Sequence, residues 1–197
     1  MWYFFVKSIF HIIFKIFLRL EVSGLENIPL TGPVVIASNH ASLLDPPLVG
    51  SSASRKVYFM AKEELFVPVF GPICASLGAF PVRRGKVDMV AMKRALQILK
   101  NQEVLGIFPE GTRSKTGKLG HGEPGALAIA CKGKAVIIPT AVIGSNLALR
   151  KTFWPKVKIV FGTPLCFSDG QTNKEALEEK SEILMEKIRI LLENNKI

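Results

Sequence analysis

The sequence has few of the residues that build disulfide frameworks or metal centres. Its three cysteines, Cys74, Cys131 and Cys166, are odd in number and far apart, and no Cys-x-x-Cys pair or H-E-x-x-H motif is present. We therefore expect no disulfide scaffold, no metal site and a reducing compartment. A G-x-S-x-G motif is also missing, so a serine acyl-enzyme is not indicated.

Negative charge is also scarce, since 16 acidic residues face 26 basic ones and the formal net charge is +10. A balance this basic predicts an anionic partner, which composition alone leaves open between nucleic acid, an acidic membrane and a phosphorylated substrate. The sequence contains no recognised nucleic-acid-binding module and no regular alternation of basic and aromatic residues, so we expect no nucleic acid partner.

The first 20 residues are mostly apolar and account for much of the high mean hydropathy of +0.29. Their basic side chains recur at every fourth position, which on a helix forms one drifting stripe. Lys7, His11, Lys15 and Arg19 make up this stripe. Cations along the whole segment disfavour a membrane span, and the apolar extreme N-terminus disfavours a signal peptide. We expect an amphipathic helix at a membrane surface, with the aromatic side chains among the acyl chains; the alternative is a helix packed on the protein's own core.

After this helix, apolar runs of strand length alternate with segments of helical periodicity. We expect strands at 34–38, 57–60, 78–82, 104–108, 135–143 and 157–161, and helices at 88–101, 125–132 and 173–194. Such alternation predicts an α/β fold. We expect a single domain at 24–197, with a mixed central sheet flanked by helices, preceded by the amphipathic helix at 1–20.

Two motifs carry the chemistry. The first is an H-x4-D pair, His40 and Asp45, in a loop closed by two prolines. On a regular helix this spacing would turn the side chains about 140° apart, so the pair converges only if the segment is a loop. The second is FPEGTRS at 108–114, which places a carboxylate, two hydroxyls and a guanidinium around a glycine turn after an apolar strand. Arginine's planar fork suits a phosphate.

The two motifs in this order resemble the glycerolipid acyltransferase family, in particular 1-acylglycerol-3-phosphate acyltransferases of bacterial type. Weaker blocks agree: GAFPVRR at 78–84, IIPT at 137–140 and KEELF at 62–66. The resemblance implies a glycerol-3-phosphate acyltransferase-like fold, acyl transfer to lysophosphatidic acid, and no cofactor beyond an acyl carrier protein (ACP) or coenzyme A (CoA) thioester as donor. It also implies a peripheral protein at the cytoplasmic face of the cell membrane, in contact with phospholipid.

The same resemblance assigns roles to residues. His40 becomes the general base for the acceptor hydroxyl, and Asp45 orients its ring. Arg113 and Arg84 bind the acceptor phosphate, with Lys62 as a further candidate. Glu110, Gly111 and Thr112 complete the substrate site, where Glu110 and Thr112 orient either the glycerol backbone or Arg113. Other acceptors remain open, namely glycerol-3-phosphate or a lysophospholipid, as does a non-catalytic protein that binds membranes or anions.

Overall fold

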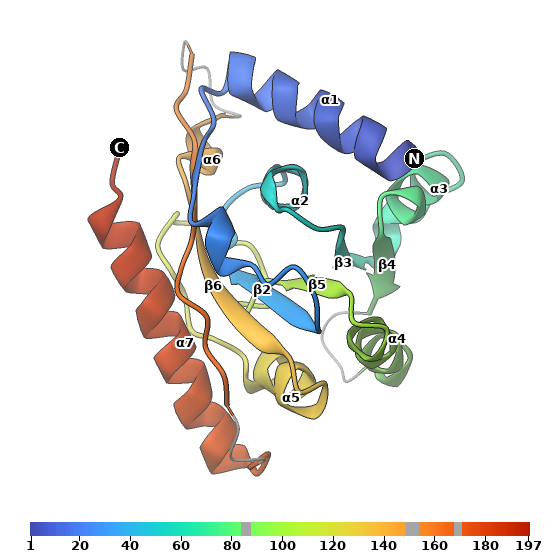
Figure 1. The fold of residues 1–197 in the computed structure, drawn as a ribbon, viewed down its shortest axis with the longest axis vertical. Helices are drawn as coiled ribbons and strands as arrows, with labels where there is room; N and C mark the ends of the chain where they lie inside the picture. Colours follow the sequence, from blue (N-terminus) through green and yellow to red (C-terminus); the bar gives the residue numbers. More distant parts are fainter. Residues whose placement is uncertain (84–87, 149–153, 168–170) are drawn as a thin grey trace.

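A seven-stranded sheet runs through the computed structural model, which describes residues 1–83, 88–148, 154–167 and 171–197 (Figure 1). The strand order is β1-β7-β6-β2-β5-β3-β4, and all neighbours are parallel except β6 and β7. The strands are β1 Glu21–Ser23, β2 Val34–Ser38, β3 Val57–Lys62, β4 Ala79–Val82, β5 Val104–Ile107, β6 Val136–Ile143 and β7 Lys158–Phe161. The predicted α/β fold with a mixed sheet is confirmed.

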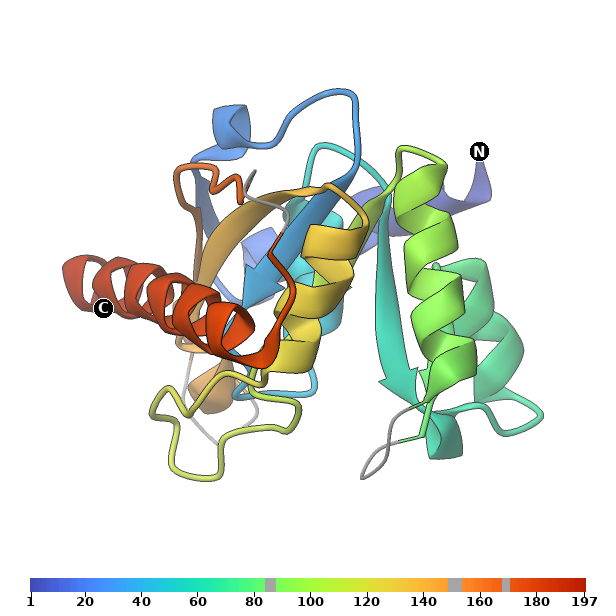
Figure 2. The same ribbon diagram turned by 90° about the horizontal axis from the view of Figure 1, so that it is seen from below.

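Helices cover both faces of this sheet. They are α1 Trp2–Phe17, α2 Asp45–Ser52, α3 Phe70–Ser76, α4 Met89–Lys100, α5 Pro124–Lys132, α6 Ser145–Ala148 and α7 Lys174–Asn194, with short 3-10 helices η1 Leu25–Asn27 and η2 Glu63–Leu65. The helices α4, α5 and α7 pack on one face, and α1 and α2 lie on the other (Figure 2). The central strand β2 is buried throughout: Val35 and Ala37 point into the first layer, and Val34 and Ile36 into the second. This side-chain alternation of a strand produces the two cores.

Several elements were not predicted from the sequence, among them β1, α3, α6 and both 3-10 helices. Strand β1 has three residues, too few for a pattern, and it enters the sheet only through its parallel pairing with β7. It therefore adds residues 21–23 to the sheet, ahead of position 24, where we expected the domain to begin. Helix α3 contains Gly71 and Pro72, residues that lower the helical signal of a sequence.

Helix α1 lies across the second layer and ends at Phe17, shortly before Arg19, whose φ is +45°. Its inner face packs on the protein, where Phe14 is buried and Phe10 contacts the same core. Lys7 also lies on this face: its ammonium donates to the carbonyl of Ala53, and burial lowers its pKa. The predicted orientation of the helix was therefore partly wrong, because part of the basic stripe and part of the aromatic set face inward.

The outer face of α1 remains apolar and exposed. It is formed by Trp2, Phe4, Phe5, Ile9, Ile12, Ile13, Ile16 and Phe17. Among the described residues, no helix combines the length and the hydropathy required to cross a bilayer.

An aromatic stack lies within the second layer and requires a glycine in β5. A Cβ atom on Gly106 would come within 2.2 Å of the Phe59 ring. Phe59 stacks in turn on Phe108, with ring centroids 6.0 Å apart. Gly106 therefore makes room for the ring that supports the residue following β5.

We expect Gly106→Ala to lower the free energy of unfolding by about 1–3 kcal/mol, because the stacked Phe59 ring must shift to admit the methyl group. Urea denaturation measures this change. Gly125→Ala is the matched control: it lies in α5 with nothing within 4 Å of the added atom, and alanine favours helix, so its stability should be equal or higher. An unchanged midpoint for Gly106→Ala would contradict the packing described.

Candidate active site

The imidazole of His40 and the carboxylate of Asp45 form a buried pair. Nδ1 of His40 lies 2.8 Å from Oδ2 of Asp45, and the two residues are 5% and 0% exposed. The same oxygen accepts the backbone N–H groups of Ala41 and Ser42, each at 2.7 Å. The H-x4-D spacing closes because His40 follows β2 in a loop, whereas Asp45 begins α2. Three donors on one oxygen leave the carboxylate little freedom to rotate.

The backbone of His40 is held by the loop that follows β5, residues 108–114. Its N–H donates to Oε1 of Glu110 at 2.8 Å, and its carbonyl accepts the N–H of Ser114 at 2.8 Å. The other oxygen of Glu110 accepts the N–H of Gly120 at 2.9 Å. Glu110 thus joins three loop segments through its carboxylate, a structural role that the sequence did not suggest.

The His40 ring is also fixed by stacking. It lies against Phe108 with centroids 4.0 Å apart and planes 19° from parallel. Within the described residues no hydrogen bond involves Nε2, so this atom is left available to a ligand. An imidazole held by a carboxylate on Nδ1, with Nε2 unoccupied, has the geometry of a general base.

His40 lies on the wall of a cavity of about 420 Å³. Phe108, Arg113 and Lys62 line the same cavity. The rest of the lining is largely apolar and comes from α1, α2, β3 and the segment η2–α3; examples are Val6, Phe10, Pro46, Leu65 and Leu77. Lys7 also lines it, so the cavity combines a base, three cations and an apolar compartment. This combination suits a ligand with an anionic group and a hydrocarbon chain.

The predicted substrate residues that the structure describes in the 108–114 loop, and Lys62, are largely exposed to solvent, except for Glu110. Gly111 and Thr112 are exposed in the 108–114 loop, and Gly111 takes a φ of +67°. Arg113 is exposed as well, and Lys62 forms an ion pair with Glu64 at 2.8 Å on the surface. Arg84 lies outside the described residues.

Asn39 is a functional candidate that sequence reasoning missed. Its side-chain amide donates to the carbonyl of Val142 at 2.9 Å and accepts the N–H of the same residue at 2.7 Å. The side-chain amide therefore continues the hydrogen bonding between β2 and β6 beyond the last residue of β2, and it fixes the chain immediately before His40. Its place next to His40 was the only sequence signal, since its partner lies far along the chain.

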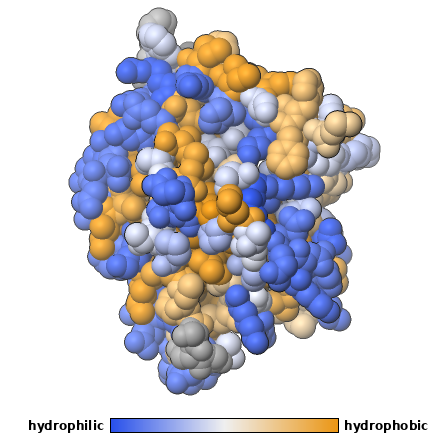
Figure 3. Space-filling model, in the orientation of Figure 1, coloured by the Kyte–Doolittle hydropathy of each residue, from blue (hydrophilic) through white to orange (hydrophobic). Residues whose placement is uncertain are grey.

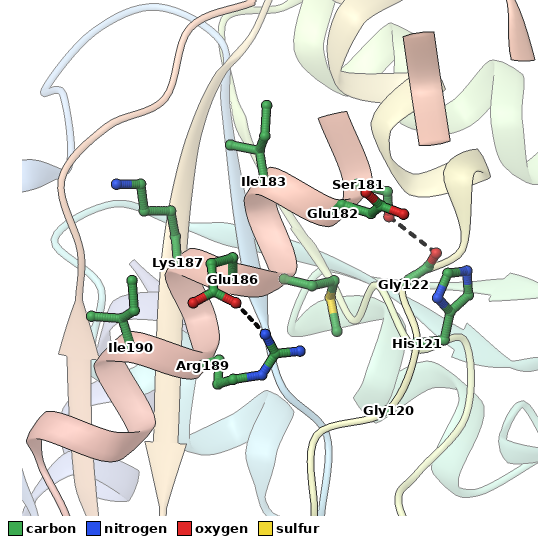
Figure 4. Close-up of a pocket in the computed structure, with 11 residues that line it drawn as sticks. Gly120, His121, Gly122, Ser181, Glu182, Ile183, Glu186, Lys187, Arg189 and Ile190 are labelled. Carbon is green, nitrogen blue, oxygen red and sulfur yellow. Dashed lines mark hydrogen bonds and ion pairs between the residues drawn. The ribbon is translucent and has the colours of Figure 1, made fainter. Parts of the chain in front are cut away.

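A second hollow, a groove of about 620 Å³, lies between residues 120–122 and α7 (Figure 4). Ser181 closes one side by donating to the carbonyl of Gly122 at 3.0 Å, and Arg189 pairs with Glu186. The groove contains no residue of the H-x4-D pair or of the 108–114 loop. In the part of the chain that the structure describes, no group of three His, Cys, Asp or Glu side chains could hold a metal ion.

We expect Nδ1 of His40 to carry the proton in the neutral ring, because the Asp45 carboxylate only accepts hydrogen bonds. Long-range ¹H–¹⁵N spectra of protein labelled at its three histidines should show an Nδ1–H tautomer for one residue. That signal should be lost in His40→Gln and should change in Asp45→Ala, while His121→Ala should not affect it. An Nε2–H tautomer for His40 would contradict the pairing.

The chain is similar to several known proteins. A family model described as Acyltransferase matches residues 19–143. A 1-acyl-sn-glycerol-3-phosphate acyltransferase of Bacillus subtilis is 32% identical over 176 residues, which cover 87% of each chain. The chloroplastic 1-acyl-sn-glycerol-3-phosphate acyltransferase LPAT1 of Arabidopsis thaliana is 35% identical over 136 residues, 66% of this chain and 37% of that protein. The chain thus spans less than two fifths of the length of the Arabidopsis relative.

A solved structure has the same fold. The crystal structure of the 1-acyl-sn-glycerophosphate (LPA) acyltransferase PlsC from Thermotoga maritima matches with a TM-score of 0.78 and 28% identity, over 96% of this chain and 79% of that one. The family model matches more than half of this chain, and the B. subtilis relative matches most of both chains. The chain therefore belongs to the acyltransferase family.

Proposed function

We propose that this protein transfers a fatty acyl group from an acyl thioester to the free hydroxyl of 1-acylglycerol-3-phosphate (lysophosphatidic acid), giving phosphatidic acid. The observation that carries the proposal is that His40 and Arg113 share the wall of one largely apolar cavity, and that Nε2 of His40 has no hydrogen-bond partner among the described residues. The relatives from B. subtilis, A. thaliana and T. maritima are named for this acceptor, which supports the same choice here.

The chemistry assigns one proton transfer to His40. Its Nε2 accepts the hydroxyl proton while the hydroxyl oxygen attacks the thioester carbonyl carbon, and Asp45 stabilises the imidazolium that forms. The tetrahedral intermediate then collapses, the C–S bond breaks, and the proton passes from His40 to the departing sulfur. The acceptor oxygen is itself the nucleophile, so no acyl-enzyme forms.

Substrate positions follow from the lining of the cavity. The acceptor phosphate binds to Arg113, with Lys62 as a further cation on the wall, and Thr112 and Gly111 lie in the same loop as Arg113. Arg84, which the family resemblance assigns to the same phosphate, lies outside the described residues. Phosphate binding there orients the hydroxyl toward Nε2, and positioning of this kind lowers the barrier to reaction. The apolar walls take a hydrocarbon chain. The donor is acyl-ACP or acyl-CoA, both acidic, and a net charge of +10 favours either.

The protein acts at the cytoplasmic face of the cell membrane, as a peripheral protein. The exposed apolar face of α1, in the segment 1–20, supports this location, because an interfacial helix places such a face among lipid tails. The net positive charge favours the anionic lipids of that leaflet. Within the described residues, Cys74, Cys131 and Cys166 form no disulfide, which suits a reducing compartment.

Transfer should depend on His40. With an acyl thioester and lysophosphatidic acid in detergent, we expect wild type and His121→Ala to release thiol and form phosphatidic acid at similar rates. His40→Ala and the larger His40→Gln should fall by a factor on the order of 10³, because the base is lost. Circular dichroism checks that both fold.

Three outcomes of this assay would contradict the proposed base, the proposed acceptor or the activity itself. Comparable product from wild type and both His40 variants would exclude His40 as the base. Turnover with glycerol-3-phosphate or a lysophospholipid, and none with lysophosphatidic acid, would overturn the proposed acceptor. No turnover with any of them would leave a non-catalytic lipid-binding protein.

A further inference from the structure

A stretch of the chain with no charged side chain lies on the surface beside α1. Residues 65–82 contain no Asp, Glu, Lys, Arg or His, and they form the end of η2, helix α3 and strand β4. Large apolar side chains in this stretch are exposed: Val69 at 70%, Phe70 at 63% and Ile73 at 51%. Val67 is also exposed. We call these four residues the α3 patch. A charge-free segment with such exposure is unusual for a surface that faces only water.

The α3 patch lies next to the apolar outer face of α1. Helix α3 lies beside the N-terminal end of α1 (Figure 1), and the indole N–H of Trp2 donates to Oγ of Ser76 at 3.2 Å. Hydrophobic residues run along the edge of the molecule that α1 forms, and paler ones continue toward the α3 side (Figure 3). The two helices therefore present one broad apolar surface instead of two separate ones.

The inner faces of the same elements line the cavity of the candidate active site. Tyr3, Val6 and Phe10 contribute from α1, and Leu65, Cys74 and Leu77 from η2–α3. The cavity thus lies between the two elements whose outer sides are apolar. A lipid that enters it from a bilayer would pass between two helices already in contact with that bilayer, and its chain would cross little water.

Both tryptophans of the chain lie at the ends of α1. Trp2 is at its N-terminus, and Trp154 donates its indole N–H to the carbonyl of Ile16 at 3.0 Å; each is 60% exposed. The Arg19 guanidinium lies over the Trp154 ring, 5.6 Å from its centroid. Indole rings with a polar edge and an apolar body prefer the boundary between water and lipid, and nearby cations favour anionic headgroups. This chemistry favours a bilayer over a second protein copy as the occupant.

We propose that the α3 patch and the outer face of α1 together form a single lipid-binding surface, and that a bilayer containing anionic lipid covers both. The inference rests on the proposed function for the identity of the lipid that enters the cavity. Binding to the bilayer does not require turnover.

The test is co-sedimentation of the full chain with vesicles of phosphatidylglycerol and phosphatidylcholine. Phe70→Ser combined with Ile73→Ser should weaken binding at least ten-fold, and Ile12→Ser combined with Ile16→Ser should do the same. The matched control is Ile183→Ser combined with Ile190→Ser, since both residues are 40% exposed on helix α7. The control should bind as wild type does, and circular dichroism should show all variants folded.

Three results would overturn the proposal. The first is an α3 variant that binds vesicles as tightly as the wild type does, and the second is a wild type that binds no vesicles. The third is an α3 change that abolishes a protein dimer in sedimentation velocity and leaves vesicle binding intact.

Activity separates this inference from the proposed function. Phe70 and Ile73 do not line the cavity, so their variant should keep wild-type turnover of lysophosphatidic acid in detergent and lose it on vesicles. Vesicle binding that depends on the α3 patch in a protein without turnover would support the surface and reject the acyltransferase activity.

Discussion

Strands β2 and β5 are parallel neighbours in the sheet, and the loops that follow them therefore leave from the same edge. Their register pairs Ala37 with Ile107, so His40 and residues 108–114 emerge side by side. The peptide groups of His40 then bond to two residues of the second loop, the carboxylate of Glu110 and the backbone N–H of Ser114. Two motifs far apart in the sequence are consequently held together by hydrogen bonds of the His40 backbone. The carboxyl edge of an open α/β sheet is also where ligands generally bind in such folds.

Packing beneath the loops extends this constraint into the core. Gly106 admits the Phe59 ring, Phe59 stacks on Phe108, and Phe108 stacks on the imidazole. Asn39 fixes the other side of His40 to β6 through two hydrogen bonds. With Asp45 on Nδ1, the ring has one orientation, and Nε2 is its only unoccupied polar atom within the described residues. The orientation of the base is thus determined by the sheet, and the reacting groups need little reorganisation.

Much of this was predictable from the sequence because its patterns are local. The apolar runs gave the position of β2 to the residue, and the proline pair after Asp45 indicated that the H-x4-D segment is a loop. Interactions between distant segments were not predictable. Strand β1 forms only by pairing with β7, and Glu110 and Asn39 find their partners through tertiary contacts. The inward face of α1 was expected only as the alternative, because its contacts depend on tertiary structure. Lys7 bonds to the carbonyl of Ala53, the C-cap residue of α2, and no periodicity reveals that contact. Arg84, which only the family resemblance indicated, lies outside the described residues.

Direct attack by the acceptor on the thioester is the central claim, and it can be tested by withholding the acceptor. Wild-type protein would be mixed with excess acyl-ACP or acyl-CoA alone, thiol release followed with a chromogenic disulfide, and the intact mass of the protein recorded before and after lysophosphatidic acid is added. Direct transfer predicts no release above the uncatalysed rate and an unmodified mass until the acceptor is present, followed by steady turnover. One equivalent of thiol released without acceptor, together with a protein heavier by one acyl group, would contradict it and require a nucleophile on the protein itself.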